Sequence, residues 1–268
     1  MQIKQIHYNN AAVFYRVTGE GKPVILLHGF GEDGDVWEFQ MEELKDHYRL
    51  IIPDLPGSGL SPLPNEAAPG LEYYAEIIHS IIITEKAEGC ILLGHSMGGY
   101  ISLALVEKYP LLLRGFGLLH SSAFADTDEK KENRLKSIDF IRKNGSYLFL
   151  KTSIPGLFSP ERSPSLPTEY PDLLIKKGNN FSSLALEQYY RAMLNRPDRT
   201  HILKQTSLPV LFILGPFDIA APIEKGLQEC HFPATSHLTI LRQSAHMGML
   251  EEFQKTNLSI RQYLKATC

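Results

Sequence analysis

The chain has 268 residues, of which 43% are hydrophobic and 21% are charged, and its formal net charge is -3 at pH 7. This composition is typical of a globular protein, and the length is sufficient for one main domain with a large buried core. The slightly acidic balance gives no attraction to nucleic acids or to anionic membranes, so we expect neither as a partner. It also disfavours a polyanionic substrate.

The N-terminal segment MQIKQIHYNNAAVFY lacks the basic start and the apolar stretch of a signal peptide. No run in the sequence reaches the roughly 18 apolar residues of a membrane-spanning helix. We therefore expect a cytoplasmic protein. The three cysteines, Cys90, Cys230 and Cys268, are too few for a disulfide framework and too widely spaced for a zinc site, so we expect ordinary thiols.

Short apolar runs and helical patterns alternate along most of the chain. The first 20 residues are typical of a β-hairpin. The later runs expected to be strands are PVILLHG, YRLIIPDLPG, CILLGHS, LRGFGLLHS, LPVLFILGPFD and HLTILRQSAH. Helical patterns over residues 37–47, 71–88 and 97–108 fall between the first four of these runs. The alternation predicts an α/β fold with a mostly parallel central sheet and helices on both faces.

The alternation stops between the runs LLHSS and LPVLFILG, where the sequence becomes helical and rich in proline. One predicted helix starts at a capping residue, Asp126 or Thr127, and stops at Gly145. We interpret this segment as a helical cap that lies over one end of the sheet. The predicted domains are a core of residues 1–121 and 206–268 and a cap of residues 122–205.

The motif Gly94-His95-Ser96-Met97-Gly98 lies where a strand pattern changes to a helical pattern. It fits G-x-S-x-G, in which small residues let the chain turn so sharply that the serine hydroxyl projects from the edge of the sheet. The alternative is a serine that only caps a helix, because serine is a favoured N-cap residue. The functional interpretation therefore requires further residues.

A serine hydroxyl is a weak nucleophile at neutral pH and needs a base that an acid orients. Asp218 follows the run PVLFILG, and His246 follows the run HLTILRQ. Serine, then acid, then histidine, with the last two following successive strands, is the chain order expected for this motif.

With these residues in place, the chain resembles the α/β-hydrolase superfamily, and within it the small serine esterases, lipase-like enzymes and C–C hydrolases with a cap. The resemblance rests on HGFGEDGDVW, DLPGSGLS, GHSMGG, GPFD and SAHMGMLE, which span nearly the whole chain. It implies that Ser96 is the nucleophile, His246 the general acid and base, and Asp218 the orienting carboxylate. It also implies an oxyanion hole formed by the backbone N–H groups of Phe30 and Met97.

The reaction expected from this resemblance is hydrolysis of a carboxylic ester through an acyl-enzyme, with neither a metal nor an organic cofactor. Apolar residues near the centre of the predicted cap, Leu148 to Phe158, are expected to cover the serine and to favour small or medium uncharged substrates. The candidates for substrate contact are Ser121, Phe124, Leu157, Phe158 and Met247.

Other reactions use the same three residues, namely C–C bond hydrolysis of a diketone, lactone hydrolysis and perhydrolysis, and the sequence does not choose among them. A hydrolase-fold receptor or regulator of a small ligand is an alternative of a different class. The segment HGFGEDGDVW resembles the start of such proteins, whereas GHSMGG departs from the smaller-residue pattern that follows their serine.

Residues 29–34 also match the dinucleotide-binding pattern G-x-G-x-x-G, with Asp54 about 20 residues further on. However, Glu32, Asp33 and Asp35 would place negative charge beside the pyrophosphate that such a loop attracts. A dinucleotide site is therefore not expected. We interpret His28, His95 and Asp54 as structural residues of loops and turns.

Overall fold

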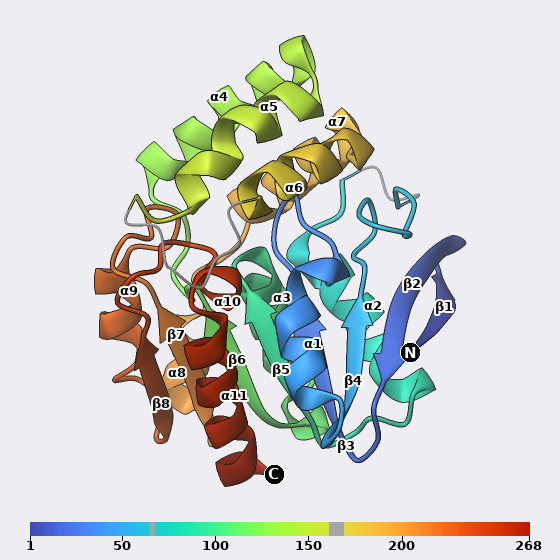
Figure 1. Ribbon diagram of the computed structural model, residues 1–268, viewed down its shortest axis with the longest axis vertical. Coiled ribbons are helices and arrows are strands. Elements are labelled where there is room, and N and C mark those ends of the chain that lie inside the picture. The colour runs from blue at the N-terminus through green and yellow to red at the C-terminus, as the bar shows by residue number, and fades with distance from the viewer. Residues whose placement is uncertain (65–67, 161–168) are drawn as a thin grey trace.

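The computed structural model describes residues 1–64, 68–160 and 169–268. Its centre is an eight-stranded sheet with the strand order β1-β2-β4-β3-β5-β6-β7-β8. The strands are β1 (Gln2–Tyr8), β2 (Ala11–Thr18), β3 (Lys22–Leu27), β4 (Tyr48–Pro53), β5 (Cys90–His95), β6 (Leu113–Leu119), β7 (Val210–Leu214) and β8 (Ser236–Ile240). Strand β2 pairs antiparallel with β1 and β4, and the other pairs are parallel. The predicted mostly parallel sheet and the N-terminal hairpin are confirmed (Figure 1).

The described helices are α1 (Glu38–Leu44), α2 (Leu71–Thr84), α3 (Met97–Lys108), α4 (Asp128–Asn144), α5 (Ser146–Ser153), α6 (Tyr170–Lys177), α7 (Ser183–Leu194), α8 (Thr200–Gln205), α9 (Ile223–Glu229), α10 (Gly248–Glu251) and α11 (Phe253–Thr267). Short 3₁₀ helices cover Gly34–Trp37, Pro110–Leu112, Ile154–Leu157 and Gly178–Asn180. The three helices predicted between the first strands are all present as α1, α2 and α3, the last with the predicted bounds.

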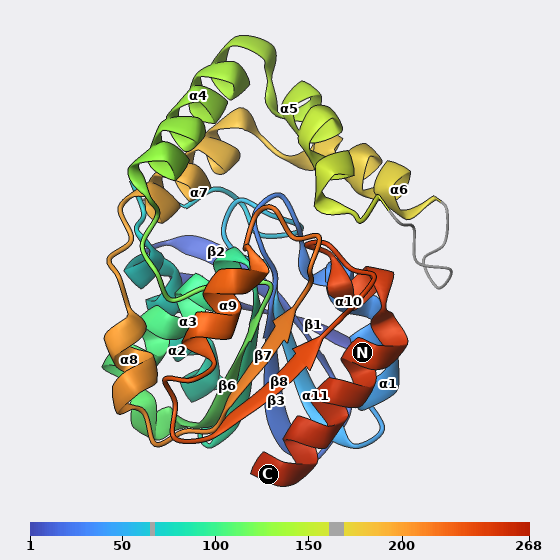
Figure 2. The same ribbon diagram turned by 90° about the vertical axis from the view of Figure 1, so that its left-hand side faces the viewer.

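Buried strand residues alternate between two hydrophobic cores, because successive side chains of a strand point to opposite faces of the sheet. In β3, Ile25 and Leu27 pack with helices α2 and α3, whereas Val24 and Leu26 pack in the core that α1 and α11 cover. Figure 2 shows these two helical layers on either side of the sheet. Burial on both faces explains why the central strands read as continuous apolar runs.

Helices α4 to α7 lie above the carboxyl ends of the central strands (Figures 1 and 2). Helix α4 begins where the sequence predicts, since the Thr127 side chain accepts a hydrogen bond from the Lys130 N–H, and Gly145 ends it at a φ of 87°. Helix α8, by contrast, packs against α3 on the face of the sheet. Part of the predicted cap, residues 161–168, lies outside the described residues.

Parallel strands bring the loops that follow them to one edge of the sheet. Ser96, Asp218 and His246 come after β5, β7 and β8 respectively, so the fold places all three at the edge that α4 to α7 cover. Within the described ranges, no helix is both long enough and apolar enough to span a membrane.

Candidate active site

Ser96 sits on a strained turn between β5 and α3. Its φ is 51° and its ψ is -115°, a backbone conformation that residues with a side chain rarely adopt. Its N–H donates to the Leu119 carbonyl at 2.9 Å, and its carbonyl accepts from the Ser121 hydroxyl at 2.7 Å. These contacts hold the turn in place from the neighbouring strand β6.

The glycines of the motif are required by close backbone contacts. A Cβ on Gly94 would lie 2.4 Å from the Gly98 carbonyl, and one on Gly98 would lie 2.5 Å from the Leu27 carbonyl oxygen. Both distances are far below a normal van der Waals contact, so only glycine fits at either position without movement of the backbone. The turn that exposes Ser96 thus depends on these two residues.

His246 and Asp218 form a buried hydrogen-bonded pair. His246 Nδ1 lies 2.9 Å from Asp218 Oδ2 and 3.0 Å from Oδ1. Asp218 Oδ1 also accepts from the N–H groups of Ala220 and Ala221, and His120 Nδ1 lies 3.1 Å from Oδ2. Burial alone would raise the pKa of Asp218, but the charge of His246 and the hydrogen bonds from His120 and His246 hold it well below its ordinary value. Asp218 is therefore an ionised acceptor for the imidazole.

The loop that carries His246 is held by a buried carboxylate that the sequence analysis missed. Glu251 Oε1 accepts from the N–H groups of Ala245 at 2.9 Å and Met247 at 3.2 Å, and Oε2 accepts from Ser159 at 2.7 Å. Burial raises the pKa of Glu251 to about 7. In the sequence, the one indication of this role is that Glu251 stands at the end of the motif SAHMGMLE.

Ser96 and His246 line one cavity of about 130 Å³. Its walls include two other predicted site residues, Phe30 and Leu157. They also include residues that were not predicted to contact a substrate, namely Glu32, Tyr100, Lys130, Arg134, Tyr190, Met193 and Ala220. A hydrogen bond between the Ser96 hydroxyl and His246 is absent from the described residues.

The other predicted contact residues are placed differently. Met247 lines a second cavity of about 80 Å³, which shares Phe30, Glu32, Leu157 and Tyr190 with the first. Ser121 lies behind Ser96 as a donor to its carbonyl. Phe124 lies beneath the Lys225 ammonium, and Phe158 packs against the hydrophobic cores. These last three residues are absent from the described walls of both cavities.

Phe30 and Met97, the predicted oxyanion-hole residues, lie near the serine, since Phe30 lines the same cavity and Met97 follows Ser96 in the chain. Met97 is the first residue of α3, so its N–H has no partner within the helix. The loop after β3 approaches Ser96 so closely that a Cβ on Gly29 would lie 3.1 Å from the Ser96 Cβ. Neither Phe30 nor Met97 donates its N–H to an acceptor in the described part of the chain.

Three polar residues have structural contacts, as the sequence predicts. His28 Nε2 accepts from the Leu55 N–H at 3.0 Å, and Asp54 accepts from the N–H groups of Gly34 and Leu60. His95 Nε2 lies 2.9 Å from the His246 carbonyl oxygen.

The glycine-rich loop is also occupied from within the chain. Glu32 Oε2 accepts from the Gly29 N–H at 2.7 Å and lies 3.0 Å from His95 Nδ1. The buried Glu32 carboxylate therefore already accepts an N–H group of the loop that a dinucleotide-binding loop would donate to a phosphate.

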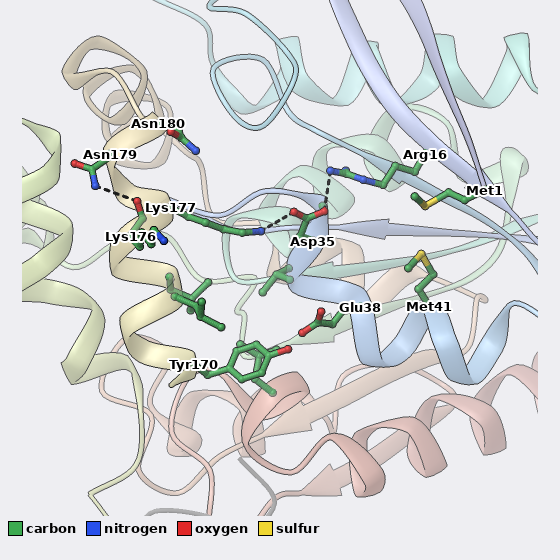
Figure 3. A pocket seen from close by; sticks show the side chains of 15 residues that line it. Met1, Arg16, Asp35, Glu38, Met41, Tyr170, Lys176, Lys177, Asn179 and Asn180 are labelled. Atoms are coloured by element: carbon green, nitrogen blue, oxygen red, sulfur yellow. Dashed lines mark hydrogen bonds and ion pairs between the residues drawn. The ribbon is translucent and has the colours of Figure 1, made fainter. Parts of the chain in front are cut away.

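A wider cavity of about 740 Å³ lies between α6 and the start of α1. Figure 3 shows Lys177 pointing toward the Asp35 carboxylate. Arg16 contacts the same carboxylate from the opposite side. The two ion pairs measure 2.6 Å and 2.9 Å. Leu174 lines both this cavity and the 80 Å³ cavity, so the three cavities form a row that leads from Ser96 toward α6.

On distance alone, His120, Asp218 and His246 offer ligand atoms within 4.8 Å of one another and are the candidates for holding a metal ion. In the structure, Nδ1 of each histidine already lies at hydrogen-bond distance from Asp218.

Comparisons with known proteins agree with the fold described above. Residues 22–144 match the family model of the α/β-hydrolase fold. A thermophilic esterase from Thermogutta terrifontis superimposes with a TM-score of 0.88 and 28% sequence identity, over 100% of this chain and 99% of that one. The chain has the α/β-hydrolase fold.

Two relatives of this chain are named as an esterase and a hydrolase. A pimeloyl-[acyl-carrier protein] methyl ester esterase from Aeromonas salmonicida is 29% identical over 248 residues, which cover 88% of this chain and 93% of the relative. An (E)-2-((N-methylformamido)methylene)succinate hydrolase from Acinetobacter baylyi is 23% identical over 264 residues, or 97% of this chain and 96% of the relative. These similarities support hydrolase activity for the chain.

Proposed function

We propose that this α/β hydrolase cleaves carboxylic esters with Ser96 as nucleophile, His246 as general base and Asp218 as the orienting acid. One observation carries the proposal. Ser96, at a φ of 51°, and His246, bonded to the buried Asp218, line the same cavity. Such strain persists where the surrounding structure holds it, and it is typical of functional sites.

The proposed reaction has two steps. Because His246 donates its Nδ1 hydrogen to Asp218, its Nε2 is free to take the Ser96 proton as the oxygen attacks the ester carbonyl. The N–H groups of Phe30 and Met97 stabilise the oxyanion. The C–O bond to the alcohol then breaks, the alcohol takes the proton from His246, and an acyl group remains on Ser96. In the second step, His246 takes a proton from water as the water oxygen attacks the acyl carbonyl. The bond to the Ser96 oxygen then breaks, Ser96 takes the proton from His246, and the acid is released.

The cavity supports a preference for small substrates. Phe30, Leu157, Tyr190 and Met193 provide much of its wall, and its volume of about 130 Å³ suits a short acyl chain. Each buried methylene contributes about 0.8 kcal/mol to binding until the cavity is full. The relative from Aeromonas salmonicida is named a methyl ester esterase, which supports a small alcohol group. Helices α4 to α7 would form the cap that limits substrate size.

The experiment is a turnover screen of methyl and p-nitrophenyl esters from acetate to long chains, together with lactones, with Ser96→Ala as the blank. We expect multiple turnovers of short esters by the wild type and none above background by the variant. Equal rates in the two proteins would contradict the proposal. Binding of one ligand per chain without turnover would support the receptor alternative instead.

A further inference from the structure

Two cations line the cavity that contains Ser96. Lys130 and Arg134 are four residues apart on α4, so both lie on the helix face that meets the cavity. The Arg134 side chain is 11% exposed and the Lys130 side chain 35%. The Arg134 charge is therefore largely removed from water and the Lys130 charge partly so, and both line the same cavity as the proposed nucleophile.

Among the residues that the structure describes, one carboxylate, Asp126, pairs with these two cations and with a third. Arg134 Nε lies 2.6 Å from Asp126 Oδ2, Arg196 Nη1 lies 2.9 Å from Oδ1, and Lys130 Nζ lies 3.8 Å from Oδ1. Asp126 is buried, and its one negative charge offsets only one of the three positive charges. The cluster of Lys130, Arg134, Arg196 and Asp126 thus carries an excess of positive charge.

The carboxylate of Glu32, which also lines the cavity, is engaged elsewhere. It accepts from the Gly29 N–H and pairs with His95. Burial alone would raise the pKa of Glu32, but the charge and hydrogen bond of His95 lower it. Similarly, Asp218 is directed to His246 and His120. Neither of these carboxylates pairs with Lys130 or Arg134.

The ring of Tyr100, another wall residue, lies in the field of the cations. The Arg196 guanidinium lies 3.9 Å from the centre of the Tyr100 ring. Burial alone would raise the pKa of Tyr100, but the positive charges of Arg196, Lys130 and Arg134 lower it below its ordinary value. This effect indicates that the positive charge extends to the cavity wall.

Donor groups remain for a ligand. An ammonium group has three N–H donors, of which Lys130 directs one to the Ala220 carbonyl oxygen at 2.7 Å. A guanidinium has five, and Arg134 directs Nε and Nη2 to Asp126. Partly buried cations are costly unless they are paired, and an anion in the cavity would pair with them.

We propose that Lys130 and Arg134 form a subsite for a free carboxylate of the substrate, within a few bonds of the ester carbonyl. The subsite rests on the proposed ester hydrolysis at Ser96 and refines its substrate class. Preferred substrates are half-esters of dicarboxylic acids or esters of small hydroxy acids. The expectation of an uncharged substrate then applies only to the part of the molecule that contacts the apolar walls. A charged hydrogen bond of this kind is worth roughly 10-fold to 100-fold in kcat/KM.

The test compares esters that differ only in charge. One series consists of monomethyl half-esters from succinate to adipate, each beside the methyl ester of the matching monoamide. A second series consists of acyl esters of glycolic acid beside those of glycolamide. We expect the wild type to prefer the carboxylate member by about tenfold or more in at least one series. No preference in either series would overturn the proposal.

Variants assign the preference to the cluster. Lys130→Gln should reduce the preference severalfold, whereas Arg134→Lys retains a charge and should keep part of it. Lys136, whose side chain is 68% exposed on the same helix, provides the control Lys136→Gln, which should leave the preference unchanged. An equal loss in the control, or none in Lys130→Gln, would contradict a role for the subsite.

Binding of glutarate separates this proposal from ester hydrolysis. Calorimetry on Ser96→Ala should detect glutarate more strongly than glutaramide, and adding Lys130→Gln should weaken glutarate alone. If glutarate binds in this way but no ester is turned over, the subsite stands and the ester hydrolysis is wrong. If esters are turned over at Ser96 without any preference and glutarate does not bind, the subsite is wrong and the hydrolysis stands.

Discussion

His120 Nδ1 lies 3.1 Å from Asp218 Oδ2, on the same carboxylate that His246 contacts. His120 is buried, has a φ of 49°, and its Nε2 has no partner among the described residues. Burial lowers the pKa of His120, so it is a neutral donor at neutral pH. The second histidine therefore fixes the carboxylate that orients the first.

His120→Ala should lower kcat about tenfold, because Asp218 loses one of the hydrogen bonds that hold its carboxylate in place. His120→Asn, which retains an N–H donor, should recover part of the loss. Steady-state kinetics with a short methyl ester would measure both effects, and His7→Ala on the exposed edge of β1 is the control. A loss as large in His120→Asn as in His120→Ala would mean that the contact serves packing only.

Ser96→Ala and His246→Ala should each lower kcat by roughly 10⁴-fold, and the double variant should lose little more, because the residues act in the same step. Background-corrected turnover of one ester by the three variants provides the test. Losses that multiply in the double variant would show that Ser96 and His246 act independently.

Gly94→Ala should destabilise the fold by about 3 kcal/mol or more, because its Cβ would lie 2.4 Å from backbone atoms of Gly98. Gly156→Ala is a matched control, since a Cβ there meets nothing within 4 Å. Urea unfolding measures both free energies. Similar stabilities for the two variants would contradict the close contact across the Ser96 turn.

The stability of the protein should respond to the ionisation of Glu251, whose pKa burial raises from 4.5 to about 7. The folded state then binds this proton more tightly than the unfolded chain does. The stabilising contribution is complete below about pH 4.5 and is lost as the pH rises through about 7.

Glu251→Gln cannot ionise, so its free energy of unfolding should fall less between pH 5 and pH 8 than that of the wild type, by a difference on the order of 2 kcal/mol. Its stability should be lower at both pH values, because an amide nitrogen cannot accept the N–H groups that the carboxylate binds. Urea titrations at both pH values measure the difference, with exposed Glu88→Gln as control. If the free energy of unfolding changed equally between pH 5 and pH 8 in the wild type and in Glu251→Gln, this result would contradict the raised pKa.

The sequence predicted the parts of the molecule that depend on local pattern. Ser96 could be placed on its turn because Gly94 and Gly98 are readable in the motif, and the α/β fold followed from the alternation of apolar runs with helices. Asp218 and His246 could be located because parallel strands deliver their following loops to one edge.

Residues whose roles depend on tertiary packing were not predicted. Lys130 and Arg134 lie in the charged stretch DEKKENRLKS, which looks like a solvent-exposed helix face until α4 is placed over Ser96. Glu251 is the last residue of the short helix α10, and nothing local shows that its carboxylate folds back on Ala245 and Met247. The position of α8 beside α3 likewise depends on contacts between distant segments.

The central claim is that Ser96 carries the acyl group during turnover. Rapid acid quench of the enzyme with a short p-nitrophenyl ester, followed by peptide mass spectrometry, measures this directly. The account predicts a transient mass increase of one acyl group on the peptide that contains Ser96, which is absent in Ser96→Ala. Ester turnover at the full rate with no adduct on Ser96, or with the adduct on another residue, would contradict it.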